Sequence, residues 1–348
     1  MRKLLIAATS ILLAVSLGSS PASAKQAHAE TIRVKVVSQN VYIGANIFRL
    51  VEGEDPNAVL ETVQQTNFPE RSDQIAKQIR RTKPDLIGLQ EVADISVFNS
   101  AGAELLSLDY LEILLESLKE KGLDYKVGAV VNNLDGTLPI GPDQFARVVD
   151  RDVILYRTKT TSITNPISKN YTTKAQLPIA GTQLDYLRGY ASVDATVRGE
   201  KLRFVNTHLE TQRAQCQTST GAIACQEAQA RELADTLSTV TLPVILVGDL
   251  NAEVGEPTYQ ILDDAGFDNT RKNHGRSPGY TCCNVETLDN ENRELDQRID
   301  HILVRAPGAK RIRASNKVLG DSQNNRTPSG LWPSDHAAPF SKIRIVYR

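Results

Sequence analysis

Side chains of the kinds that bind metal ions and transfer protons recur where apolar runs of strand length end. Asn40 follows "VVSQ", and Glu91 follows "LIGLQ". A single asparagine or aspartate at such a place has an ordinary explanation, because these residues cap turns through local hydrogen bonds. Six strand ends of this kind predict instead that the residues share one rim of a layered β fold. The residues at these ends are Asn40, Glu91, Asn206, His208, Asp249, Asn251, Asp300, His301, Asp335 and His336.

The carboxylates and amides in this set are hard oxygen ligands. Glu91, Asp249 and Asp335 offer carboxylates, with the amides of Asn40 and Asn251 beside them. Mg²⁺, Mn²⁺ and Ca²⁺ prefer such ligands, and the set contains no cysteine. We expect a divalent cation, with Mg²⁺ as the first candidate and Mn²⁺ or Ca²⁺ as alternatives.

Two histidines in the set, His208 and His336, carry groups that change charge near neutral pH. Such groups can act as acid and base. The sequence has no G-x-S-x-G nucleophile motif, no P-loop and no dinucleotide-binding glycine pattern. These residues therefore favour metal-assisted acid–base chemistry over serine-hydrolase or nucleotide-binding chemistry.

The elements that would position these residues alternate along the chain. Apolar runs such as "DLIGLQEV", "LRFVNTHL" and "VILVGDL" predict strands. "YASVDATV" and "LRFVNTHL", separated by "RGEK", predict an antiparallel hairpin. Because the strands are many, two packed sheets flanked by helices are easier to build than one open sheet. Helices are predicted over residues 69–81, 103–121, 225–237 and 257–265.

The N-terminus has the features of a secretory signal peptide. Arg2 and Lys3 precede an apolar run, and Ala22-Ser23-Ala24 offers a small-residue cleavage site. A membrane anchor is the alternative, but the apolar run is short for a membrane span. We expect cleavage near Ala24, secretion to the extracellular or periplasmic space, a linker over residues 25–31 and one catalytic domain over residues 32–348.

The charge of the chain is nearly balanced, with 40 basic and 41 acidic residues. Loss of Arg2 and Lys3 with the signal peptide makes the mature chain mildly acidic. No large basic excess or stripe of the kind that dominates nonspecific nucleic-acid binding is visible. The short runs "RRTK" and "KRIR" are the candidates for a basic surface.

Four cysteines follow the signal peptide. In an oxidising compartment we expect disulfides. Cys216 and Cys225 bracket the polar loop "CQTSTGAIAC", so we predict that they are bonded to each other. For Cys282-Cys283 a vicinal disulfide and a reduced pair both remain open.

Taken in order, the motifs "SQNV", "LQEV", "NTHL", "GDLN", "RIDHILV" and "SDH" resemble the endonuclease/exonuclease/phosphatase superfamily. The resemblance spans about residues 32 to 346. Members of this superfamily include DNase I-like nucleases and neutral sphingomyelinases. It implies a four-layer α/β sandwich, in which two packed mixed sheets are flanked by helices. It also implies metal-dependent hydrolysis of a phosphate ester by in-line attack of water.

The resemblance assigns roles residue by residue. Glu91 would be the main metal ligand, with Asn40 beside it and Asp335 acting directly or through water. His336 would be the general base or a transition-state stabiliser, oriented by Asp300.

Four further assignments concern the attacking water and the leaving group. Asp249 and Asn251 would position the water and a nonbridging phosphate oxygen. His208 would donate a proton to the leaving oxygen. Asp152 is a candidate partner that orients His208, although an ordinary aspartate at a strand start is an equal alternative.

Two residues are candidates for substrate binding, namely Arg188 and Asn206. Arg188, in "YLRGYA", would contact a phosphate through its planar guanidinium. A solvated surface arginine is the simpler alternative.

The substrate class stays open among nucleic acid, phospholipid head groups and small phosphodiesters. A DNase I-like nuclease is our first expectation, and a sphingomyelinase-like phospholipase C is the alternative. A lipid enzyme should carry an exposed apolar hairpin, yet no aromatic-rich loop is visible. A noncatalytic binding module on the same fold is a distant alternative, because every motif position carries a chemically competent residue. We expect a monomer with no stable protein partner.

Overall fold

The computed structural model describes residues 31–179, 182–212, 214–218, 221–271 and 278–347. The predicted signal peptide and most of the predicted linker lie outside these residues. Residue 31, the last residue of the predicted linker, already belongs to the first strand, β1 (Thr31–Asn40). Among the described residues, no helix is both long and apolar enough to span a membrane.

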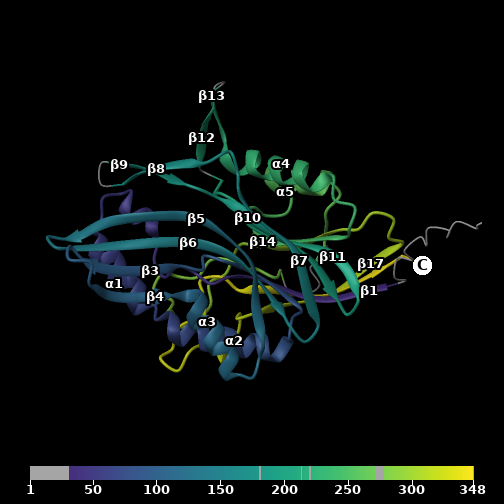
Figure 1. The fold of residues 1–348 in the computed structure, drawn as a ribbon, viewed down its shortest axis with the longest axis horizontal. Helices are drawn as coiled ribbons and strands as arrows, with labels where there is room; N and C mark the ends of the chain where they lie inside the picture. Colours follow the sequence, from purple (N-terminus) through teal and green to yellow (C-terminus); the bar gives the residue numbers. More distant parts are fainter. Residues whose placement is uncertain (1–30, 180–181, 213, 219–220, 272–277, 348) are drawn as a thin grey trace, which may run out of the picture.

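Two large sheets form the centre of the molecule (Figure 1). Both sheets are mixed, because β1 in the first sheet and β14 (Val244–Asp249) in the second each pair in parallel with one neighbour and antiparallel with the other. The first sheet has the order β17 (Arg311–Leu319), β18 (Ala338–Val346), β1, β2 (Leu86–Gln90), β6 (Gln144–Arg157), β3 (Asp94–Asn99) and β4 (Glu104–Asp109), with β5 (Tyr125–Gly141) paired to β6.

The second sheet carries the predicted hairpin, with β10 and β11 antiparallel as expected. Its strands follow the order β15 (Asp268–Asn269), β16 (Asp300–Arg305), β14 (Val244–Asp249), β11 (Glu200–His208), β10 (Gly189–Val197) and β7 (Thr161–Asn170). Two small hairpins stand outside both sheets, namely β8 (Ala175–Ile179) with β9 (Thr182–Tyr186), and β12 (Gln215–Thr218) with β13 (Gly221–Ala224).

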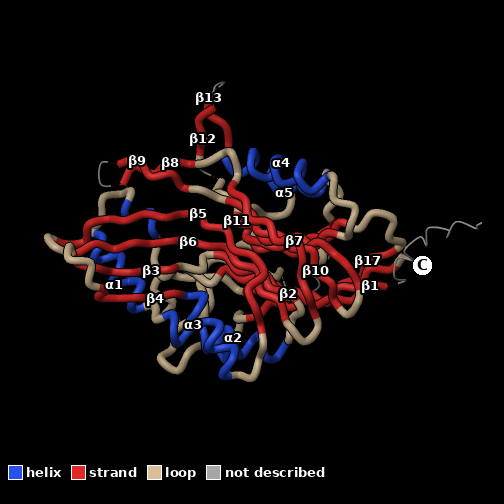
Figure 2. The backbone as a smooth tube through the Cα atoms, in the orientation of Figure 1, coloured by secondary structure: helices blue, strands red, loops and turns tan. Residues whose placement is uncertain are grey.

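The helices lie on the outer faces of the two sheets (Figure 2). Three of them cover the first sheet and two cover the second. The first group is α1 (Pro56–Gln65), α2 (Phe68–Thr82) and α3 (Tyr110–Glu120), and the second is α4 (Cys225–Ser238) and α5 (Pro257–Asp264). Two short 3-10 helices, η1 (Ile47–Leu50) and η2 (Gln323–Asn325), lie in loops.

The alternation of side chains along each strand produces four layers. Val36 of β1 packs between the two sheets, whereas its neighbour Val37 packs against α1, α2 and α3. In β14, Ile245 faces the first sheet and Leu246 faces α4 and α5. A strand that is buried on both faces needs apolar side chains at consecutive positions. This explains the continuously apolar sequences of β1 and β14. The predicted four-layer α/β sandwich is confirmed.

One glycine permits the close approach of the two sheets. A Cβ atom on Gly88 of β2 would lie 2.4 Å from Asn206 Oδ1 and 2.4 Å from Val247 Cγ2, atoms of the opposite sheet. Real Cβ atoms do not come so near other atoms, so only glycine fits here without displacement. Asn206 occupies the space thus left, and its Nδ2 donates to Leu89 O and Val153 O.

One predicted helix is partly wrong. Residues 104–109 of the predicted helix 103–121 form strand β4, which pairs with β3. The helix begins after Asp109, whose carboxylate accepts hydrogen bonds from Leu111 N and Glu112 N. A side-chain cap of this kind marks a helix start, and the strand pairing with β3 holds the preceding residues extended.

Candidate active site

The strand ends singled out by their polar residues meet at one edge of the sandwich. In the second sheet, His208 is paired with Asp249, and Asp249 is paired with Asp300. The first sheet brings Asn40 and Glu91 to the same place, since Asn40 Nδ2 donates to Asp249 Oδ2 across 3.1 Å. Together these ends surround a hollow of about 320 Å³, which we call the polar cavity and whose lining includes Glu91, Asp150, Arg188, His208, Asp249, Asn251, Cys283, Asp335 and His336.

Glu91 is held in place by its neighbours on two sides. Its Oε1 accepts a hydrogen bond from Asn40 Nδ2 at 2.8 Å, and its Oε2 accepts one from Ile43 N at 2.9 Å. Burial raises the pKa of Glu91, and the nearby Asp335 carboxylate raises it further. Burial likewise raises the pKa of Asp335. Both carboxylates are half-buried and repel each other. A divalent cation between them would stabilise their ionised forms.

Asn40 contacts two of the carboxylates of the site. Its amide oxygen accepts a hydrogen bond from Tyr42 N at 2.9 Å, while its amide nitrogen binds Glu91 and Asp249. The side chain therefore orients two carboxylates, and its expected place beside Glu91 as a metal ligand stays a prediction.

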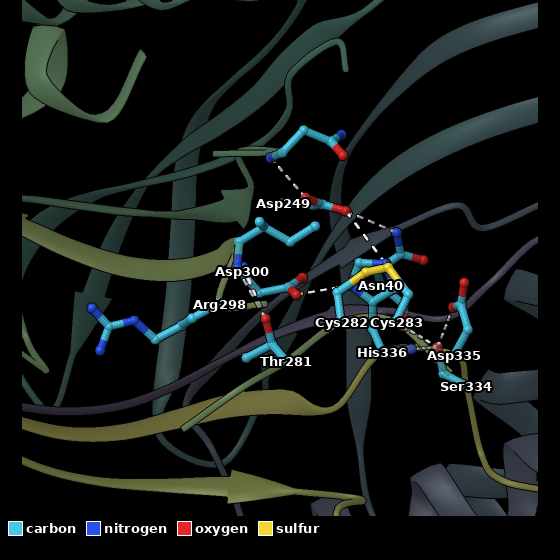
Figure 3. The surroundings of a disulfide bond; sticks show 12 residues. Asn40, Asp249, Thr281, Cys282, Cys283, Arg298, Asp300, Ser334, Asp335 and His336 are labelled. Carbon is cyan, nitrogen blue, oxygen red and sulfur yellow. Dashed lines mark hydrogen bonds and ion pairs between the residues drawn. A yellow bond between two sulfur atoms is a disulfide. The ribbon is translucent and has the colours of Figure 1, made fainter. Parts of the chain in front are cut away.

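His336 and Asp300 form the closest imidazole–carboxylate pair in the polar cavity (Figure 3). Nδ1 of His336 lies 2.8 Å from Asp300 Oδ2, and Nε2 lies 3.7 Å from Asp249 Oδ2. Burial disfavours the charged imidazolium, but Asp300, Asp335 and Asp249 outweigh it and hold the pKa of His336 well above its ordinary value. These carboxylates therefore favour the imidazolium form, and Nε2 faces Asp249.

His208 has the opposite electrostatic environment. Its Nδ1 lies 2.9 Å from Arg188 Nη1, and a guanidinium can only donate, so Nδ1 is the acceptor and the proton resides on Nε2. Burial lowers the pKa of His208 well below its ordinary value, and Arg188 lowers it further. The neutral ring faces Asp249, with Nε2 3.5 Å from Asp249 Oδ2.

Asp249 lies between the two histidines at the end of β14. A Cβ atom on the preceding Gly248 would lie 2.0 Å from Thr207 O, which explains the glycine of "GDLN". Asp249 Oδ1 accepts from Asn251 N at 2.9 Å, and Asn251 Nδ2 donates to Leu209 O. Burial and the Asp300 carboxylate raise the pKa of Asp249 to about 7.

Three sequence-based assignments differ from the contacts found. The residue that contacts His208 Nδ1 is Arg188, whereas the predicted partner was Asp152. Arg188 is 3% exposed, so the alternative of a solvated surface arginine is wrong; it lines the polar cavity, and its predicted contact with a phosphate stays a prediction. Asn206 lies between the sheets, where it bonds to Leu89 O, Val153 O and Gln90, and so its role is to join the sheets.

The predicted site residues did not include a buried acidic group behind Arg188. Asp150 Oδ2 lies 3.9 Å from Arg188 Nη1, and Glu210 Oε2 lies 3.6 Å from Arg188 Nε. Burial raises the pKa of Asp150 to about 6, and burial followed by Asp150 raises the pKa of Asp152 well above its ordinary value. The signal in the sequence was "VVDRDVI", which places two acids on one face of a strand.

The two cysteine pairs differ in their surroundings. The predicted bond between Cys216 and Cys225 is present, and both residues are buried in an apolar cluster with the β8–β9 hairpin. Cys282 and Cys283 are bonded to each other, and Cys283 Sγ lies 4.0 Å from His336 Nε2 (Figure 3). The vicinal pair thus belongs to the wall of the polar cavity.

Two groups of ligand-type atoms lie within 4.8 Å of one another among the described residues. One is Asp249, Asp300 and His336, and the other is Cys282, Cys283 and His336. The polar cavity therefore combines carboxylates suited to a hard cation with two imidazoles in different proton states.

Comparisons with known proteins agree with this arrangement. The family model described as Endonuclease/Exonuclease/phosphatase family matches residues 45–336, and the chain belongs to this family. A search of curated proteins finds no match.

Solved structures share the fold at low sequence identity. A mannosyl-6-phosphatase from Bacteroides thetaiotaomicron is 18% identical with a TM-score of 0.54, over 89% of this chain and 99% of that one. A family protein from Leptotrichia buccalis is 18% identical with a TM-score of 0.57, over 89% and 99% of the two chains. TDP2 from D. rerio, in complex with a single-strand DNA product, is 15% identical with a TM-score of 0.53, over 89% and 98%.

Proposed function

We propose that the protein is a metal-dependent phosphoesterase that hydrolyses phosphodiester bonds by in-line attack of water, with residues 32–348 as its catalytic domain. The observation that carries the proposal is the arrangement around Asp249. His208 Nε2 and His336 Nε2 lie 3.5 and 3.7 Å from the same carboxylate oxygen. One wall of the polar cavity thus offers an acceptor for a water proton and two donors for phosphate oxygens.

Glu91 and Asp335 are the residues that we propose to hold the cation, with Mg²⁺ first and Mn²⁺ or Ca²⁺ as alternatives. The raised pKa of each carboxyl, caused by burial, supports this assignment, because a divalent cation would favour both ionised forms. When bound, the cation supplies positive charge that stabilises charge developing on the phosphate in the transition state.

The remaining residues divide the proton chemistry. Asp249, with Asn251 beside it, positions the attacking water. The raised pKa of His336 supports the second of its two expected roles, in which the imidazolium stabilises a nonbridging oxygen. His208 is neutral and presents Nε2–H, so it donates a hydrogen bond toward the leaving oxygen.

For the substrate, we propose a phosphodiester, with a DNase I-like nuclease as the first candidate and nucleic acid as its substrate. A phospholipid head group, as in a sphingomyelinase-like phospholipase C, or a small phosphodiester are the alternatives. The fold shared with TDP2 and with a mannosyl-6-phosphatase supports phosphate-ester chemistry in general. We propose further that the protein is a secreted monomer, released by cleavage near Ala24.

The test is hydrolysis of bis-p-nitrophenyl phosphate with Mg²⁺, Mn²⁺ or Ca²⁺, and with excess EDTA. We expect EDTA to abolish activity, and Glu91→Gln and His336→Ala each to lower kcat by about 10²–10⁴-fold. Lys119→Ala, on the exposed side of α3, is the control and should retain full activity. Activity that persists in EDTA, or in His336→Ala, would contradict the mechanism.

A further inference from the structure

A second cavity, of about 70 Å³, lies directly beside the polar cavity. Every side chain that lines it is apolar, and only Gly136 contributes bare backbone. Its walls come from α1, from the long strands β5 and β6, and from the β8–β9 hairpin, which lie at one end of the molecule (Figure 1). We call it the apolar cavity.

The two cavities share Ile43 and Ile47 in their linings. Ile43 performs two tasks at once. Its backbone N–H donates to Glu91 Oε2 at 2.9 Å and its carbonyl accepts from Tyr110 Oη at 3.0 Å, while its side chain forms a wall of the apolar cavity. Only Ile43 therefore lies between the apolar cavity and Glu91, the residue that we propose to hold the cation.

The chemistry of the lining selects the occupant. Protein interiors normally leave few voids larger than a water molecule, and a void without polar partners stays dry and accepts apolar ligands. A nucleobase or a sugar would bury donors and acceptors that find no side-chain partner there. Because the lining also contains no aromatic ring, a base would have nothing on which to stack.

We propose that the apolar cavity is a subsite for the first carbons of an unbranched alkyl or acyl chain carried by the phosphate-ester substrate. The inference rests on the proposed phosphoesterase function, and among the substrates proposed for it favours an amphiphile, such as a phospholipid, over nucleic acid. The chain enters past Ile43 and Ile47 while the phosphate lies in the polar cavity. A lipid enzyme is expected to carry an exposed apolar hairpin, whereas this subsite is enclosed.

The test uses unbranched alkyl phosphates, from methyl to decyl, as competitive inhibitors below their micelle concentrations. Each methylene that enters the apolar cavity should lower Ki by about fourfold, which is the value of one buried methylene. We expect the effect to stop when the chain outgrows the cavity. A Ki that does not change with chain length would overturn the proposal, provided that bis-p-nitrophenyl phosphate is still hydrolysed. Absence of that hydrolysis would instead contradict the proposed function itself.

Substitutions in the lining test whether the dependence of Ki on chain length arises in the apolar cavity. Ala146 of β6 lines the apolar cavity, so Ala146→Phe should fill it and abolish the dependence of Ki on chain length. Leu138→Phe, at a half-buried position of the same lining, replaces it if the first variant fails to fold. Ile167→Phe, on the exposed face of β7, is the matched control and should keep the dependence. Retention of the full dependence in both folded lining variants would contradict the assignment.

A membrane lipid and a soluble ester would present the same chain. Hydrolysis of dihexanoyl phosphatidylcholine below its micelle concentration would indicate a soluble amphiphile. Hydrolysis restricted to long-chain phosphatidylcholine or sphingomyelin in vesicles would indicate a membrane source. Either result supports the subsite, and failure to hydrolyse any chain-bearing ester by an enzyme active on bis-p-nitrophenyl phosphate overturns it.

Discussion

Arg188 helps to keep its neighbour His208 neutral, in addition to the effect of burial. The guanidinium donates to Nδ1 and is itself held between Asp150 and Glu210 and over the ring of Tyr186, whose centroid lies 4.6 Å away. Two carboxylates thus keep a positive charge beside a buried imidazole, and this charge adds to burial in opposing protonation of the ring. His208 consequently stays a neutral donor, which is an unusual condition for a histidine expected to serve as an acid.

Replacing Arg188 by Met should raise the pKa of His208, because one of the three causes that lower it would be removed, leaving burial and the charge of His336. It should also release the fixed Nε2–H tautomer. Both are measurable from the imidazole ¹⁵N and ¹H shifts during a pH titration by NMR. Arg188→Lys, which keeps the charge, should leave the pKa low.

Arg147→Met, at an exposed ion pair with Asp135, is the matched control and should leave His208 unchanged. An unaltered titration of His208 in a folded Arg188→Met variant would show that the guanidinium does not set its proton state.

At the level of elements, α2 connects the two loops that carry the active-site acids. Arg71 of α2 is fully buried, and its guanidinium donates to Val41 O at 2.6 Å, Tyr42 O at 3.1 Å and Pro333 O at 3.0 Å. Ser334 Oγ, beside Pro333, donates to Asn40 O at 2.8 Å. The loop after β1 and the loop before β18 are therefore held at a constant separation.

Arg71→Met should lower the free energy of unfolding by about 3 kcal/mol or more, since several buried carbonyls would lose a charged donor. It should also lower kcat more than it raises KM, because Asp335 and His336 follow Pro333 directly. Chemical denaturation and steady-state kinetics measure the two effects. Arg81→Met, on the exposed part of the same helix, should change neither.

At the level of the whole molecule, the distance between the sheets depends on Gly88. The added methyl of Gly88→Ala would meet Asn206 and Val247 and force the sheets to shift. We expect a loss of about 1–3 kcal/mol in unfolding free energy, typical of overpacked cores. The midpoint of urea unfolding measures it. Gly141→Ala is the control, because a Cβ there has only Gln144 Cβ nearby, at 3.9 Å. Equal midpoints for the two variants would show that the sheets tolerate the added atom.

Much of the fold follows from local sequence. The predicted helices at residues 69–81, 225–237 and 257–265 correspond to α2, α4 and α5. Helix α1 was missed despite Asp55, which accepts from Asn57 N as its cap. Residues 104–109 were predicted as helix because "ELLSL" suits either state, and only pairing with β3 makes them a strand.

The sequence by itself determined which residue types stand at the strand ends, because alternation of apolar side chains and ordered motifs are local properties. It also determined the disulfide bond between Cys216 and Cys225, since a short polar loop joins the two residues. Only the tertiary structure decided the partners of those residues. Arg188 reaches His208 because the antiparallel register pairs Gly189 with His208, and that register places two residues far apart in sequence side by side. The apolar cavity is likewise a product of packing. It forms only where four parts of the chain come together, namely α1, β5, β6 and the β8–β9 hairpin.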